Sequence, residues 1–137
     1  MKGRLVLIVD DNPDIRTLAG AVLQGAGYST VLAASGEDAL IWLAGATRLP
    51  DVVVLDVQMP ETDGWTTLAR IRDDERLAHL PVVLCTVNAG PEDRERGLDL
   101  RADKYLAKPF AIDQFVMVVD ELARAHHRAT PEACRQP

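Results

Sequence analysis

Residues 5–13 read LVLIVDDNP, a run of five aliphatic residues followed by two aspartates, an asparagine and a proline. An unbroken aliphatic run of this length is typical of a β-strand that helices cover on both faces. Pro13 stands where the first turn of a helix tolerates proline, and apolar residues at helical spacing follow it as far as Gly25. The stretch therefore predicts a buried strand, a short acidic turn and a helix.

The same strand–helix unit recurs along the chain. Five apolar runs are interpreted as strands: residues 5–9, 28–32, 52–55, 82–85 and 105–107. Strands that alternate with helices imply right-handed crossovers and a parallel sheet. The predicted fold class is α/β, a doubly wound five-stranded parallel sheet in the order 2-1-3-4-5 within a flavodoxin-like three-layer α/β/α arrangement.

Two predicted helices carry expectations about packing. Residues 89–100 offer few apolar anchors, so we expect a weakly packed helix with low local stability there. Trp65 is expected to pack the third helix against the sheet, and Asp63-Gly64 just before it is interpreted as a simple turn. Three arginines are interpreted as the solvated face near the third helix: Arg70, Arg72 and Arg76.

Length and composition limit the classes of protein to which the chain can belong. Its 137 residues suit one domain, expected over residues 1–124, with residues 125–137 as a tail or the start of a linker. A net charge of −6 disfavours direct DNA binding, because a polyanion requires clustered cations. The apolar runs are far shorter than a membrane span, and the residues before the first strand do not resemble a signal peptide, so we expect none. We expect a cytoplasmic protein without membrane contact.

Polar residues follow the predicted strands at their carboxyl ends. Asp10 and Asp11 end the first strand, Asp56 the third and Thr86 the fourth, while the fifth runs into Lys108. In a doubly wound sheet these ends meet at one edge, where the functional crevice lies. The chain has only three lysines, which makes a lysine at this edge notable.

Three neighbouring carboxylates repel one another unless a cation lies among them. Ligand sets made only of oxygen suit Mg²⁺, and the lack of histidine or cysteine ligands here disfavours zinc. A metal beside a carboxylate and a lysine is equipped for phosphoryl transfer. Asp56 is the best candidate for the nucleophile, because it lies on the central strand and faces both the acid pair and Lys108.

These residues, with their neighbours DVQMPETDG at 56–64 and YLAKPF at 105–110, resemble the receiver domain of two-component response regulators. The resemblance covers about residues 4–124. It implies that Asp56 is the phosphoacceptor and takes its phosphoryl group from a histidine kinase or a histidine phosphotransfer protein. It also implies that Asp11, Asp56 and the Gln58 carbonyl hold Mg²⁺, with Asp10 acting through water.

The resemblance further implies how the signal is read. Thr86 and Lys108 would contact the phosphoryl oxygens, and Tyr105 would change rotamer on activation. A downstream protein would then bind the face formed by the fourth helix, the fifth strand and the fifth helix. Such a protein is not an enzyme in the ordinary sense, because it catalyses only its own phosphorylation and dephosphorylation.

Two positions depart from the usual pattern of the family. Arg101 stands where glycine is usual, and a left-handed backbone there would cost about 1–2 kcal/mol. Val87 replaces the usual alanine after Thr86, and its bulk would restrict access to the phosphoryl group.

Three other functions are compatible with parts of the pattern. A dehalogenase-like phosphatase needs a second acid two residues after its nucleophile, and Asn12 and Gln58 stand at those positions instead. A flavodoxin-like FMN module needs phosphate donors after the first strand, where this chain has acids and Pro13. A pseudo-receiver, which docks without being phosphorylated, stays the alternative because of Val87 and Arg101.

Overall fold

The computed structural model describes residues 4–57, 63–86, 91–108 and 111–129, with side chains as far as residue 125. Five strands and five helices alternate along the chain: β1 Leu5–Val9, α1 Pro13–Gly25, β2 Ser29–Ala33, α2 Gly36–Gly45, β3 Val52–Asp56, α3 Gly64–Asp73, β4 Val82–Thr86, α4 Pro91–Asp99, β5 Lys104–Ala107 and α5 Ile112–Ala129. The strands form one parallel sheet in the order β2-β1-β3-β4-β5. The predicted fold class and strand order are confirmed.

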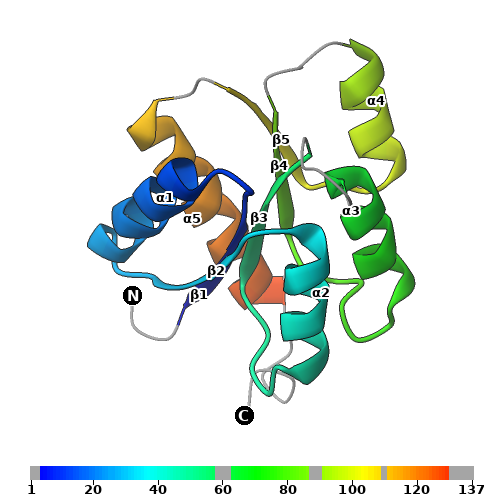
Figure 1. Ribbon diagram of the computed structural model, residues 1–137, viewed down its shortest axis with the longest axis horizontal. Helices are drawn as coiled ribbons and strands as arrows, with labels where there is room; N and C mark the ends of the chain where they lie inside the picture. The colour runs from blue at the N-terminus through cyan, green and yellow to red at the C-terminus, as the bar shows by residue number, and fades with distance from the viewer. Residues whose placement is uncertain (1–3, 58–62, 87–90, 109–110, 130–137) are drawn as a thin grey trace.

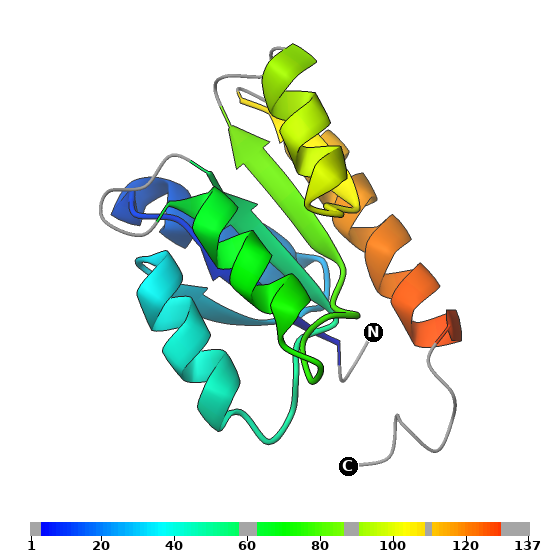
Figure 2. The same ribbon diagram turned by 90° about the vertical axis from the view of Figure 1, so that its right-hand side faces the viewer.

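The sheet separates two apolar cores. Helices α1 and α5 cover one face of the sheet, and α2, α3 and α4 lie on the other (Figures 1 and 2). Alternate residues of β1 serve the two cores, since Leu7 and Val9 pack with α2 and α3 while Val6 and Ile8 pack with α1 and α5. Burial on both faces explains why these strands are aliphatic throughout.

Helix α3 begins closer to the sheet than a simple turn would bring it. Asp63 caps the helix, accepting a hydrogen bond from the Thr66 amide at 2.8 Å. A Cβ on Gly64 would lie 2.5 Å from both the Asp56 carbonyl oxygen and the Val57 Cα. The interpretation of Asp63-Gly64 as a simple turn was incomplete, because the pair caps α3 and lets it approach the end of β3.

The predicted solvated arginine face is wrong for Arg72 and holds for Arg70 and Arg76, which are exposed. Arg72 is buried, and its guanidinium donates to the carbonyl oxygens of Ala78, Leu80 and Arg101. Arg76 donates to the carbonyls of Leu43 and Ala46, at the end of α2. Both side chains satisfy backbone acceptors that the ends of other elements leave open.

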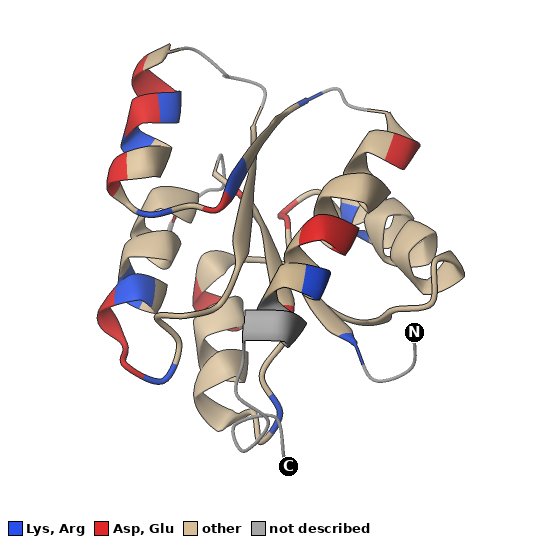
Figure 3. Ribbon diagram, turned by 180° about the vertical axis from the view of Figure 1, so that it is seen from behind, with Lys and Arg blue, Asp and Glu red and all other residues tan. Residues whose placement is uncertain are grey.

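Helix α4 is attached to the domain by few apolar contacts, as the sequence predicted. Gly97 is its one buried residue, whereas Leu98 is 73% exposed. A Cβ at Gly97 would lie 3.3 Å from the side chains of both Leu84 and Tyr105. Acidic and basic residues lie side by side along the helix (Figure 3), and two of them reach aromatic rings: Arg94 over Tyr105 at 5.2 Å and Arg96 over Trp65 at 4.7 Å.

Arg101 has a left-handed backbone, with φ at 62°. This conformation suits the glycine that is usual at this position and is costly for arginine. Its amide and that of Ala102 donate to Leu98 and Gly97, which closes the end of α4. Arg72 donates twice to the Arg101 carbonyl oxygen, at 2.7 and 3.1 Å, and so holds the strained residue in place.

Arg101→Gly is therefore expected to raise the free energy of unfolding by about 1 kcal/mol. The gain is the left-handed penalty that glycine avoids, less the backbone entropy that glycine adds to the unfolded chain. Urea denaturation followed by circular dichroism measures it. Arg70→Gly in the exposed part of α3 is the control and is expected to destabilise. A destabilised Arg101→Gly protein would contradict the assignment of strain to this residue.

The C-terminal helix runs further than the sequence analysis predicted. Helix α5 continues to Ala129, five residues past the expected boundary at residue 124. The apolar periodicity of α5 ends near Ala123, so no pattern in the sequence indicated that the helix continues. Residues 130–137 of the predicted tail lie outside the described part of the chain. No helix among the described residues is long and apolar enough to cross a membrane.

Candidate functional site

The carboxyl ends of the strands bring the predicted polar residues to one edge of the sheet. Asp10 directly follows β1, Asp56 ends β3 and Lys108 directly follows β5. Register pairs Asp56 with Cys85 and Thr86 with Ala107, so neighbouring strands end level with one another. Two predicted positions, Gln58 and Val87, lie outside the described residues.

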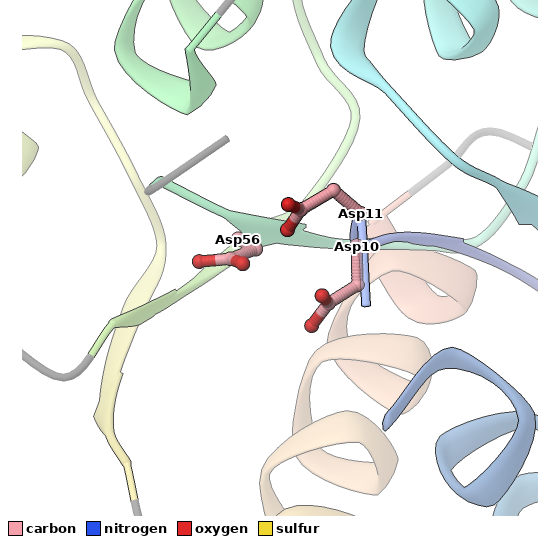
Figure 4. A group of neighbouring side chains, drawn as sticks. All are labelled: Asp10, Asp11 and Asp56. Carbon is pink, nitrogen blue, oxygen red and sulfur yellow. The ribbon is translucent and has the colours of Figure 1, made fainter. Parts of the chain in front are cut away.

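Three carboxylates form the centre of this edge. One oxygen each of Asp10, Asp11 and Asp56 lies within 4.8 Å of the others. Asp10 and Asp11 extend from the end of β1 towards Asp56 on β3 (Figure 4). Asp10 and Asp56 are buried, whereas Asp11 is exposed. A cluster of carboxylate oxygens, open on one side, fits a hard divalent cation such as Mg²⁺, which keeps several waters.

Lys108 supplies the positive charge that the buried acids require. Its Nζ lies 3.1 Å from Asp10 Oδ2 and 3.5 Å from Asp56 Oδ2, and its side chain is 14% exposed. Burial opposes the charge on Lys108, but the carboxylates of Asp56 and Asp10 outweigh it and raise its pKa. The ammonium is therefore fully protonated at neutral pH and fixed between two carboxylates. Its backbone amide donates to the Thr86 carbonyl at 2.8 Å, which ties β5 to β4 at the site.

Asp10 is held by hydrogen bonds with four other residues, and its own amide donates to the Ala33 carbonyl at 3.1 Å. Lys108 donates to Oδ2, and the Asn12 amide donates to Oδ1 at 2.9 Å. Arg16, one turn into α1, donates from Nη1 to the Asp10 carbonyl oxygen at 2.8 Å. Sequence analysis did not predict that Arg16 and Gly64 contact the site. For Arg16, the only signal in the sequence was an arginine shortly after the acid pair.

Thr86 and Tyr105 lie on the face of the sheet that carries α4. Thr86 is fully buried at the end of β4, and Tyr105 is half-buried beside Leu84. Leu84 and Tyr105 belong to the core under α2 and α3. Thr86 is two residues after Leu84 on β4, so its side chain points to the same face of the sheet. Thr86 therefore lies at the site edge, and Tyr105 lies diagonally across from it on β5, beside Gly97 and Arg94 of α4.

Cys85 lies beside the site without joining it. With Asp10, Asp56 and Lys108 it lines a cavity of about 20 Å³, which is room for one water molecule. Burial raises the pKa of its thiol to about 12, and Lys108 acts in the opposite direction. The thiol is buried and protonated, as expected of a small core residue.

We expect Cys85 to resist alkylation in the folded protein. The raised pKa leaves very little of the reactive thiolate at pH 8, and the small cavity does not admit a reagent. In a Cys134→Ser background, iodoacetamide at pH 8 should add no mass in buffer and one carbamidomethyl group in 6 M guanidinium. Modification of the folded protein within minutes would contradict this burial.

The family model described as the response regulator receiver domain matches residues 6–120. The chain belongs to this family. Among its relatives, the DNA-binding dual master transcriptional regulator RpaA of Synechocystis is 37% identical over 131 residues, which are 95% of this chain and 53% of RpaA. This receiver thus spans about half the length of that relative.

Solved receivers have the same fold. The chemotaxis protein CheY4 of Vibrio cholerae is 30% identical and superimposes with a TM-score of 0.81, over 87% of this chain and 98% of CheY4. The receiver domain of the sensor histidine kinase PA1611 from Pseudomonas aeruginosa is also 30% identical, with a TM-score of 0.80 over 89% of this chain and 98% of that domain. Its active-site cleft contains a coordinated magnesium ion.

Proposed function

We propose that this receiver accepts a phosphoryl group on Asp56 from a phosphohistidine of a histidine kinase or phosphotransfer protein. The observation that carries the proposal is the ammonium of Lys108, fixed between the carboxylates of Asp10 and Asp56 beside the exposed Asp11. If Asp10 and Asp11 only capped the first helix, no lysine would need to lie between Asp10 and Asp56. The arrangement presents one carboxylate as a nucleophile, with cationic charge ready for the oxygens of an incoming phosphoryl group.

In the proposed transfer, a carboxylate oxygen of Asp56 attacks phosphorus in line with the phosphorus–nitrogen bond. As the new phosphorus–oxygen bond forms, the imidazole leaves with the electron pair of the broken bond. Lys108 keeps Asp56 in place before transfer and pairs with a phosphoryl oxygen afterwards. Thr86, at the same edge, donates its hydroxyl to a second oxygen.

Mg²⁺ fits the three carboxylates and, when bound, neutralises charge on the phosphoryl oxygens. Asp11 and Asp56 would hold it directly, together with the Gln58 carbonyl, and Asp10 would act through a water molecule. Lys108 already balances part of the charge on Asp10 and Asp56. We therefore expect weak binding that depends strongly on Asp11.

The experiment is phosphorylation with acetyl phosphate, followed by intact mass. The wild-type protein should gain one phosphate with Mg²⁺ and none with EDTA. Asp11→Ala should reduce both the gain and the amide shifts that Mg²⁺ causes in NMR spectra. A wild-type protein that gains no phosphate from acetyl phosphate or from a phosphorylated kinase domain would instead be a pseudo-receiver.

A receiver of this kind passes the signal to a downstream protein. We propose that the signal is read on the face formed by α4, β5 and α5, and that the protein works in the cytoplasm with its phosphodonor. We expect α4 to be the part that moves, because Gly97 is its one buried residue and two of its exposed arginines, Arg94 and Arg96, lie over aromatic rings.

Phosphorylation is expected to change hydrogen exchange across α4 and β5 through Thr86 and Tyr105. A charge-assisted hydrogen bond contributes about 1.5–3 kcal/mol, while a shift from 1:99 to 99:1 needs about 5.5 kcal/mol. Thr86 and Lys108 must therefore act together. With beryllofluoride as the phosphoryl mimic, amides of residues 91–107 should change protection about tenfold in the wild type.

Thr86→Ala should remove most of that change while beryllofluoride still binds. Thr67→Ala, which removes another buried hydroxyl, is the control and should leave it intact. Changes confined to the loop after Asp56, or equal changes in Thr86→Ala, would contradict the coupling.

A further inference from the structure

We propose that Arg16 is a positioning residue for the divalent cation, acting through the backbone that carries Asp11. The inference rests on the proposed function and adds to it a residue outside the predicted ligand set. Its basis is the 2.8 Å hydrogen bond from Arg16 Nη1 to the Asp10 carbonyl oxygen, at the point where β1 turns into α1.

Within the described part of the chain, Asp11 is the one acid of the cluster whose carboxylate no other side chain or amide supports. Asp10 accepts from Lys108 and the Asn12 amide, and Asp56 pairs with Lys108. Among the described residues, none forms a hydrogen bond or ion pair with the exposed Asp11 carboxylate. The direction of this side chain is therefore set by its backbone.

That backbone is held on both sides of the Asp11 Cα. The peptide unit between Asp10 and Asp11 is fixed by its carbonyl oxygen, which accepts from Arg16. The next unit is fixed by its amide, since the Asn12 N–H donates to Asp10 Oδ1 at 2.9 Å. A hydrogen bond on each of these planar units restrains the backbone of Asp11, and its side chain lies towards the cluster (Figure 4). Arg16 supplies one of these two anchors.

Arg16 is well placed to hold this position. Its amide donates to the Asn12 carbonyl at 2.9 Å within the first turn of α1, and Asn12 caps that helix through the amides of Asp14 and Ile15. The side chain is half-buried, which limits its freedom. The guanidinium therefore joins the rigid start of α1 to the acidic turn.

A positioning role and a simple charge effect predict opposite results. A nearby positive charge repels Mg²⁺, so its removal alone would tighten binding. Loss of an anchor would instead spread the orientations of Asp11 and weaken binding. Removal of a residue that orients a metal ligand typically weakens metal affinity by about 10- to 100-fold. Because Asp11 is exposed, we expect a loss of about tenfold when Arg16 is replaced.

The experiment is a Mg²⁺ titration of the full chain, followed by amide shifts in NMR spectra. Arg16→Met should raise the dissociation constant about tenfold, and Arg16→Lys, which keeps the charge and a donor, should recover part of the loss. Arg70→Met makes the same charge change on the exposed part of α3 and should leave binding within twofold. Thermal unfolding of each variant without metal confirms that it is folded.

A second arm asks whether Arg16 acts through Asp11. In an Asp11→Ala background, Arg16→Met should cause no further loss of Mg²⁺ affinity. Equal or tighter binding by Arg16→Met alone, or the same tenfold loss with Asp11→Ala, would overturn the inference. A wild-type protein that binds no Mg²⁺ would refute the proposed function instead.

Discussion

Asp56→Asn is expected to abolish phosphorylation of this receiver, with no added phosphate where the wild type gains one. Asparagine keeps the shape of the side chain but removes the charged oxygen that attacks phosphorus. It also removes the charge that pairs with Lys108 at 3.5 Å. Asp56 is buried at the end of the central strand β3, whereas the other two carboxylates of the cluster, Asp10 and Asp11, follow β1.

The measurement is intact mass after incubation with acetyl phosphate and Mg²⁺. Asp113→Asn, an exposed carboxylate at the start of α5, is the matched control and should gain phosphate as the wild type does. Lys108→Ala should phosphorylate poorly or fail to change hydrogen exchange in α4. An undiminished gain in Asp56→Asn would move the phosphosite elsewhere.

Arg72→Met is expected to lower the free energy of unfolding by about 3 kcal/mol, a large part of the stability of a domain of this size. The guanidinium donates to the buried Leu80 carbonyl at 2.6 Å and twice to the partly buried Arg101 carbonyl, and methionine would remove these donors. Its ion pair with Asp103, at 3.0 Å, adds little because that carboxylate is 41% exposed. Burial lowers the pKa of Arg72, with Asp103 acting in the opposite direction, which reflects a desolvated charge.

Urea denaturation of Arg72→Met and Arg70→Met tests this directly. The exposed Arg70 should lose less than about 0.5 kcal/mol. A change at Arg72 as small as that at Arg70 would show that the buried network is not stabilising. Arg72→Lys should recover only part of the loss, because one ammonium cannot reproduce the fork of donors.

Local patterns were enough for the fold and for the ends of the strands. Residues 5–9 and 52–55 are aliphatic throughout because both faces are covered, and that property is visible in the sequence. Once the strands are known, parallel order alone brings Asp10, Asp56 and Lys108 to one edge. The strain at Arg101 could be anticipated for a similar reason, since a non-glycine residue at a turn keeps its own conformational cost.

Only the tertiary structure decided which side chains satisfy the backbone of distant elements. Arg72 and Arg70 look alike in sequence, yet one is buried against Leu80 and Arg101 and the other faces water. Arg16 reaches the Asp10 carbonyl, and Gly64 allows α3 to contact Asp56, for the same kind of reason. Periodicity reports which face of an element is apolar, whereas these contacts depend on the distance and angle between elements, which the sequence near each residue does not contain.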